Sequence, residues 1–179
     1  MPPANAAVQE YVGIVLSNSV YPEVLGVEHD YEYDPETREL TLTVLVCVPG
    51  RLRAEKAYRY VKAKDEIIAT ALPNKDLKER YASVIHQVAL RTLHEIFEAD
   101  RAGKIQTIAL QVATDAKDPA TGLERRVAFV GVGADRDSFM RFNLHNIVPA
   151  ATLEHLGAAV SKNPYELVGI GEAPGVRGR

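Results

Sequence analysis

The sequence predicts an α+β domain in which a mostly antiparallel sheet packs against one long amphipathic helix, with short flanking helices. Residues 75–100 repeat apolar side chains every three or four positions, the spacing of one helix face. Asp34-Pro35 and Asp118-Pro119 each stand between segments of strand character, and Asp-Pro is typical of tight turns. A long helix between two hairpins favours a sheet that the helix covers on one face.

The elements before the long helix are expected to be one helix and two paired strands. Residues 5–18 carry apolar side chains at helical spacing, and Pro22 follows soon after their end. Residues 28–33 and 39–48 flank the first turn and alternate in strand fashion. One face of residues 39–48 is apolar and the other is half apolar, so we expect a central strand covered on both sides.

Two more strands are expected at residues 57–61 and 67–72, directly before the long helix. Asn74 is placed to cap that helix through its side-chain oxygen, and Gly103 supplies a left-handed exit. The side chains expected to be buried are Leu77, Tyr81, Val84, Ile85, Val88, Leu93, Ile96 and Phe97.

The second hairpin is expected to join residues 105–114 to residues 124–133. A short helix carrying Phe139 begins at Asp135, and a further helix runs over residues 149–160. We expect residues 1–170 to form a single domain. Residues 171–179 are rich in glycine and are expected to be a disordered tail.

Composition favours a soluble protein of the reducing cytoplasm. A hydrophobic fraction of 46% and a charged fraction of 25% are typical of globular domains. The sequence has no apolar run long enough to span a membrane and no signal-peptide pattern at its first residues. Cys47 is the only cysteine, so no intrachain disulfide can form.

The sequence offers no catalytic constellation, so we predict a non-enzymatic protein without a metal site or cofactor. His86 and His94 are eight residues apart on the long helix, whereas metal-binding helices favour a spacing of four. No cysteine or acidic partner completes a site around them. Cys47 lies in an apolar strand and is expected to behave as a small hydrophobe.

Charge is distributed unevenly along the chain, whose overall net charge is −3. Residues 1–46 hold eight acidic residues and one arginine, a net charge of −7. Residues 51–64 hold six basic residues and one glutamate, a net charge of +5. These two blocks are expected either to neutralise each other, across strands or between subunits, or to leave a basic surface for nucleic acid.

The basic block contains one candidate binding face. Period-2 spacing places five of its residues on one side of an extended segment, where cations can follow phosphates while bases stack on rings. They are Lys56, Tyr58, Tyr60, Lys62 and Lys64. The alternative is a sheet face on which the tyrosines pack across strands and the lysines pair with the acidic block.

Several stretches resemble a known protein family. They are YRYVK at residues 58–62 with DEI at 65–67, KERYASVIHQVALRTLHEIFEAD at 78–100, and PAATLEHL at 149–156 with VSKNP at 160–164. Together they resemble the non-catalytic region that precedes the nuclease domain in bacterial Mrr-like restriction endonucleases, over roughly residues 5–168.

The resemblance implies a defence setting for this chain. In such proteins the following nuclease domain carries the catalytic residues, and we expect that domain to be missing here because the chain ends at Arg179. The expected function is therefore a non-enzymatic accessory module of a restriction or phage-defence system, mediating assembly or regulation. The expected partners are further copies of the chain or a nuclease effector, and a nucleic-acid-binding module is the alternative.

Overall fold

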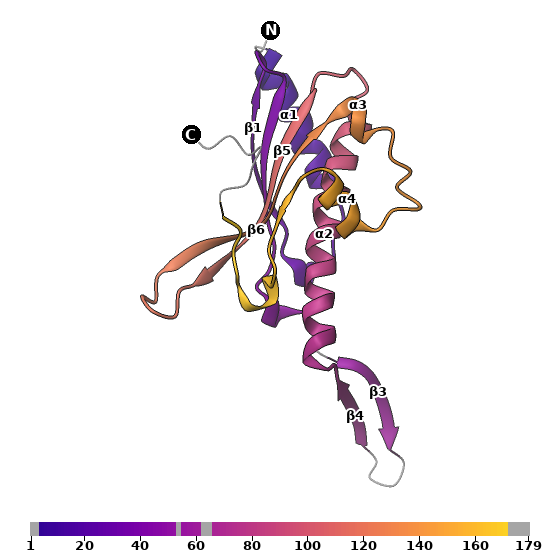
Figure 1. Cartoon of the computed structure of the whole chain (residues 1–179), viewed down its shortest axis with the longest axis vertical. Coiled ribbons are helices and arrows are strands. Elements are labelled where there is room, and N and C mark those ends of the chain that lie inside the picture. The colour runs from indigo at the N-terminus through magenta and orange to yellow at the C-terminus, as the bar shows by residue number, and fades with distance from the viewer. Residues whose placement is uncertain (1–3, 53–54, 62–65, 172–179) are drawn as a thin grey trace.

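A five-stranded sheet forms the centre of the molecule and confirms the predicted α+β class (Figure 1). The computed structural model describes residues 4–52, 55–61 and 66–171. The strand order is β1-β2-β5-β6-β7, and every neighbouring pair is antiparallel except β2 and β5, which run parallel. The strands are β1 Glu28–Asp34, β2 Glu39–Leu45, β5 Thr107–Lys117, β6 Glu124–Asp135 and β7 Ala159–Val160.

Helix α2, Asn74–Ala99, lies along one face of this sheet and supplies much of the core. Its fully buried residues include most of those expected from the apolar spacing, and they are Tyr81, Ile85, Val88, Leu93, Ile96 and Phe97. Leu77 and Val84 are only half-buried, because they lie at the border of the apolar face. The predicted cap at Asn74 is wrong: the helix begins at Asn74, and Pro73 precedes it without a side-chain cap.

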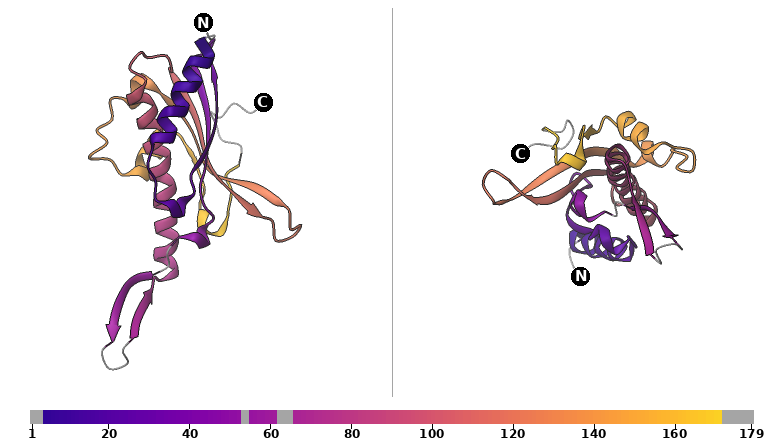
Figure 2. Two further views of the ribbon diagram at one scale, coloured as in Figure 1. Left: turned by 180° about the vertical axis from the view of Figure 1, so that it is seen from behind. Right: turned by 90° about the horizontal axis from the view of Figure 1, so that it is seen from below.

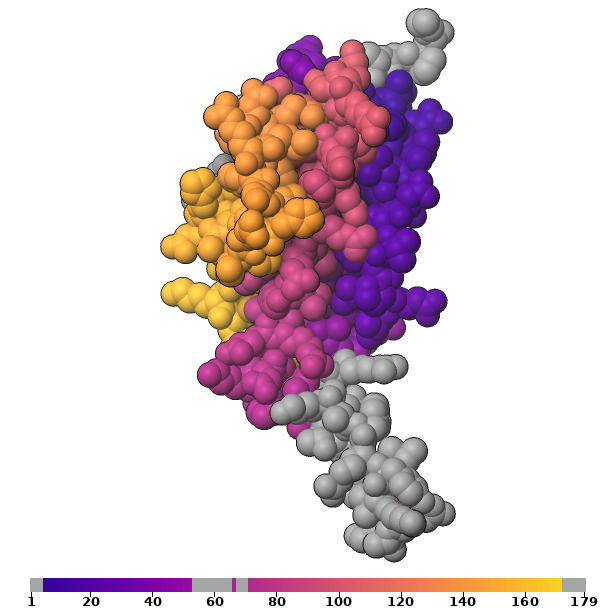
Figure 3. Space-filling model, turned by 90° about the vertical axis from the view of Figure 1, so that its right-hand side faces the viewer, coloured from indigo at the N-terminus to yellow at the C-terminus, as the bar shows by residue number. Residues whose placement is uncertain are grey.

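Helix α1, Ala4–Asn18, packs against the same core beside α2 (Figures 2 and 3). Its bounds agree with the predicted helix, residues 5–18, to within one residue. Val12 and Leu16 are buried there. Gly13 allows a close approach to β1, because a Cβ atom at this position would clash with the Tyr31 hydroxyl. The sheet face opposite both helices is more open.

Strand β2 is interior to the sheet, as predicted, but it ends at Leu45 rather than at residue 48. Leu40, Leu42 and Val44 are almost completely buried beneath the helices. The expected cover on its second face is wrong at Thr41, which is exposed. The apolar residues of that face are Leu45, which is half-buried, and Cys47, which is buried just beyond the strand.

The two turns that share Asp-Pro are built alike. The Asp34 carboxylate accepts the Glu36 N–H at 2.9 Å, and the Asp118 carboxylate accepts the Ala120 N–H at 2.7 Å. This is the local bond by which aspartate stabilises a turn. Gly122 closes the second turn with φ +70°, which favours glycine.

The C-terminal part of the chain forms two short α-helices and the last strand of the sheet. Helix α3, Arg136–Phe139, carries Phe139 as predicted and begins one residue later than expected, with Asp135 as its cap. Helix α4, Pro149–His155, is shorter than expected, because residues 159 and 160 leave the helix and pair with β6 as β7. Of the predicted tail, residues 171–179, all but Gly171 lie outside the described residues. Among the described residues, no helix has the length and apolar character to cross a membrane.

Candidate functional site: the hairpin arm and the groove at the end of α2

The basic and aromatic face predicted from the sequence falls on a separate hairpin, here called the arm. Strand β3, Glu55–Val61, pairs antiparallel with β4, Glu66–Ala71, and neither joins the main sheet. The arm extends from the first residue of α2 away from the body (Figure 1). Both strands were predicted, but their separation from the main sheet was not.

Three of the five predicted site residues lie in β3, and two lie outside the described residues. Tyr58 and Tyr60 are paired in register with Ala69 and Ile67 of β4. Lys56 stands where the register shifts, between Glu55 and Ala57. Lys62 and Lys64 belong to the residues between β3 and β4 that the structure does not describe. The common face of all five therefore stays a prediction.

The arm adds little to the core of the protein. The backbone contacts of β3 and β4 lie almost entirely between these two strands, and neither strand pairs with the main sheet. A single two-stranded ribbon is only marginally stable in water without a surface to pack on. The two strands of the arm are thus held mainly by their pairing with each other.

The acidic block lies on the body of the molecule. Glu28, Asp30 and Glu32 are exposed on one face of β1, the edge strand of the sheet. The β1–β2 turn reaches the C-terminal end of α2, whereas the arm leaves from its N-terminal end. These ends are separated by the 26 residues of α2, about 39 Å at the usual helical rise.

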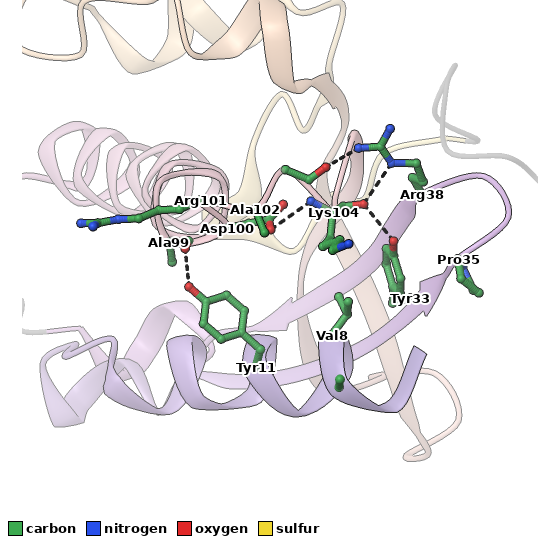
Figure 4. Close-up of a pocket in the computed structure, with 12 residues that line it drawn as sticks. Val8, Tyr11, Tyr33, Pro35, Arg38, Ala99, Asp100, Arg101, Ala102 and Lys104 are labelled. Carbon is green, nitrogen blue, oxygen red and sulfur yellow. Dashed lines mark hydrogen bonds between the residues drawn. The ribbon is translucent and has the colours of Figure 1, made fainter. Parts of the chain in front are cut away.

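A groove of about 790 Å³ lies at the C-terminal end of α2, between α1, the β1–β2 turn and the α2–β5 loop (Figure 4). Val8 and Tyr11 form its wall on α1. The Tyr11 hydroxyl donates to the Ala99 carbonyl, and the Tyr33 hydroxyl donates to the Lys104 carbonyl at 2.8 Å. Burial raises the pKa of Tyr33, so this hydroxyl remains a donor across the neutral range.

The polar groups of the groove hold the α2–β5 loop in place. Asp100 is buried and accepts the N–H groups of Lys104, at 3.0 Å, and Ile105, at 2.7 Å. It also forms an ion pair with Arg136. The Arg38 guanidinium donates to the carbonyls of Gly103 and Lys104. Because these groups are engaged in the loop, their arrangement is that of a structural joint.

Sequence reasoning did not find this joint, although it predicted the left-handed Gly103, which has φ +62°. One signal was present. Asp100 follows the last turn of α2, where the helix dipole disfavours negative charge. An aspartate at that position indicates other partners, and Arg136 with two backbone N–H groups are those partners.

The histidines and the cysteine are dispersed over the body. Among the described residues, no three His, Cys, Asp or Glu side chains gather closely enough to hold a metal ion. His94 contacts Glu98 at 3.1 Å on α2. His86 is half-buried on another side of the same helix. Cys47 is buried just beyond β2, and burial raises the pKa of its thiol, which disfavours the reactive thiolate.

Two half-buried imidazoles, His29 and His86, predict acid sensitivity. Burial lowers the pKa of His29, partly offset by Glu95, and burial lowers the pKa of His86. Below about pH 6.5 these two histidines bind more protons in the unfolded chain than in the folded one, because their pKa is lower in the folded state. The free energy of unfolding should therefore fall as the pH falls from about 6.5 toward the native pKa values.

Urea unfolding at about pH 7.5 and about pH 5.5 measures this effect. His86→Gln should reduce the loss of stability between the two pH values, whereas the control His145→Gln, at an exposed position, should leave it unchanged. An identical pH dependence in wild type and His86→Gln would contradict the assignment.

No family model, no curated protein and no solved structure matches this chain.

Proposed function

We propose that this chain is a non-enzymatic accessory module of a restriction or phage-defence system, and that it mediates assembly by binding a nuclease effector through the arm. The observation that carries this proposal is the projecting β3–β4 hairpin (Figure 1). The defence setting rests on the resemblance to the region preceding the nuclease domain of Mrr-like restriction endonucleases. The nuclease activity belongs to the partner.

The composition of the arm supports a protein partner. Its sequence combines Tyr58, Tyr60 and Ile67 with several cations, which is the mixture of anchors and charges found in protein interfaces. An exposed strand edge rich in such residues invites pairing with another chain. A partner that covers the ribbon would supply the packing surface that the body does not.

The same arm supports a second candidate function, binding of single-stranded nucleic acid. The net charge of +5 over residues 51–64 would attract phosphates, and Tyr58 and Tyr60 recur at the period of a strand. In that case Lys56, Lys62 and Lys64 would contact the backbone while the tyrosines stack on bases. The acidic residues of β1 would weaken the attraction at low salt.

Removal of the arm tests the proposal. Glu55 pairs with Ala71, so residues 56–70 can be replaced by Gly-Gly without separating their ends. The shortened chain should keep its thermal unfolding midpoint within a few degrees, because β3 and β4 form a separate sheet and do not pair with the main one. It should lose binding to a purified nuclease encoded beside its gene, measured by biolayer interferometry.

The matched control is Leu123→Ala at the tip of the second hairpin, where the side chain is 70% exposed. This variant should bind the nuclease as the wild type does. Equal nuclease binding by the wild type and the shortened chain would contradict a role for the arm. A large loss of thermal stability on shortening would show instead that the arm belongs to the fold.

Fluorescence anisotropy with single-stranded DNA at about 50 mM salt separates the two functions. If the arm binds nucleic acid, Tyr60→Ala should cost about 1–3 kcal/mol of binding free energy, and Lys62→Ala should lower the salt slope by about one. Absence of DNA binding together with arm-dependent nuclease binding would leave assembly as the function.

A further inference from the structure

The groove at the C-terminal end of α2 has the size and lining of a site for a small organic molecule (Figure 4). Its volume of about 790 Å³ lies in the usual range of small-molecule pockets, about 300–1,000 Å³. Its apolar walls are Val8 and Tyr11 from α1, Tyr33 and Pro35 from the β1–β2 hairpin, and Ala99 from α2. Pockets for small molecules combine such a lining with a few polar groups.

Hydrogen bonds between the walls fix the shape of the groove. The Tyr11 hydroxyl donates to the Ala99 carbonyl and so joins α1 to α2. The Tyr33 hydroxyl donates to the Lys104 carbonyl at 2.8 Å and joins β1 to the α2–β5 loop. Both hydroxyls are engaged within the protein, so the two tyrosine rings are held in place as walls. The groove is therefore preformed, and a ligand that binds there need not order its walls.

The ammonium of Lys104 is a polar group of the groove that the protein itself does not engage. The backbone N–H of Lys104 donates to Asp100, but its ammonium has no hydrogen bond or ion pair with any residue that the structure describes. Figure 4 shows this side chain directed toward the space between Tyr33 and Val8. An ammonium carries three N–H donors and a full positive charge, so beside apolar walls it favours an anionic partner.

The other charges around the groove also favour an anion. Three cationic residues line it, Arg38, Arg101 and Lys104. Within the described part of the lining, Asp100 is the only acid, and it already pairs with Arg136 and accepts two backbone N–H groups. Arg101 extends away from the groove in Figure 4 and adds positive potential from a distance. The side of the groove formed by the α2–β5 loop is thus positive.

These features together define the chemistry of a ligand. A neutral apolar molecule would remove water from the Lys104 ammonium without replacing its hydrogen bonds, which costs free energy. A small polar anion would leave the apolar walls at Val8 and Tyr11 in contact with water. A molecule that carries one anionic group and an apolar body satisfies both sides of the groove.

We propose that this groove binds a small organic anion with an apolar body, its carboxylate at the Lys104 ammonium and its body between α1 and the β1–β2 turn. The groove lies at the opposite end of α2 from the arm. The proposal goes beyond the proposed function, because nuclease binding through the arm does not require a ligand here. A bound ligand would contact α1, the β1–β2 turn and the α2–β5 loop at once.

A two-dimensional amide NMR titration with octanoate, at about 50 mM salt, measures both the affinity and the place of binding. The wild type should show saturable shifts with a dissociation constant of about 1 mM or lower. The shifted amides should belong to residues 7–11, 33–38 and 99–104, which line the groove. Octanol, which has the same chain length without the charge, should bind at least about fivefold more weakly.

Substitution of Lys104 tests the anionic contact. Lys104→Gln should raise the octanoate dissociation constant at least about fivefold, whereas Lys104→Arg keeps the charge and should leave it within about twofold. Lys117→Gln removes the same charge at an exposed position on the second hairpin and should leave the affinity unchanged. The amide spectrum of each variant shows whether it is folded.

Four results would overturn the proposal. The first is a titration of the wild type that does not saturate by about 10 mM octanoate. The second is a set of shifts that lies outside the groove. The third is octanol binding as tight as that of octanoate, and the fourth is unchanged affinity in the folded Lys104→Gln variant.

Discussion

Replacing Asp100 by Ala is expected to lower the free energy of unfolding by about 3–5 kcal/mol, because it leaves the largely buried cation of Arg136 without its carboxylate partner. The Asp100 side chain is 5% exposed, and its ion-pair partner Arg136 is 15% exposed. The substitution also removes the acceptor for the N–H groups of Lys104 and Ile105. Denaturant unfolding followed by circular dichroism measures the loss.

A double-mutant cycle isolates the ion pair from these backbone bonds. Asp100→Ala with Arg136→Ala should cost less than the sum of the single losses, because the second change removes the unpaired charge. Arg126→Ala is the control, since Arg126 pairs with Asp115 at the surface and should cost about 1 kcal/mol or less. If Asp100→Ala lowers the free energy of unfolding no more than Arg126→Ala does, Asp100 does not hold the α2–β5 loop as described.

The second large effect is expected in the core face of α2. Ile96 is 1% exposed and Val88 is 3% exposed. Ile96→Ala should lower the free energy of unfolding by about 2–4 kcal/mol, because the deletion leaves a cavity beneath the helix. Val88→Ala should cost less than Ile96→Ala, since it removes fewer buried carbon atoms. Urea unfolding with a constant m-value measures both losses.

Arg91→Ala is the matched control on the other side of α2. Its guanidinium contacts Glu95 at 2.7 Å and lies 4.5 Å from the centre of the Tyr21 ring, but 42% of the side chain is exposed. Contacts of this exposed kind are worth about 1 kcal/mol or less. Losses of similar size at Ile96 and Arg91 would mean that the core face has been misassigned.

Local patterns were sufficient to predict most of the elements. The apolar repeat of α2, the alternation of β2 and the two Asp-Pro turns are each encoded within a short stretch of sequence. Element ends were less certain, because β2 and α4 end where tertiary contacts replace local preference. The single parallel pair, β2 with β5, joins segments more than 60 residues apart and has no local signature.

The separation of the arm could not be predicted for a similar reason. An alternating strand has the same sequence pattern whether it joins a sheet or forms an isolated ribbon. The sequence predicted β3 and β4 as strands. It did not show that they pair only with each other, away from the main sheet. The groove was equally hidden, since Tyr11, Tyr33 and Lys104 come from three distant segments.

Hydrogen–deuterium exchange of the intact chain, alone and with the nuclease encoded beside its gene, tests the central claim most directly. The proposed function predicts slower exchange of the β3 and β4 amides in the mixture, with α2 and the main sheet unchanged. The Gly-Gly variant that lacks residues 56–70 should show no change on mixing. Unaltered exchange in the arm while the nuclease is bound elsewhere would contradict the assembly function proposed for it.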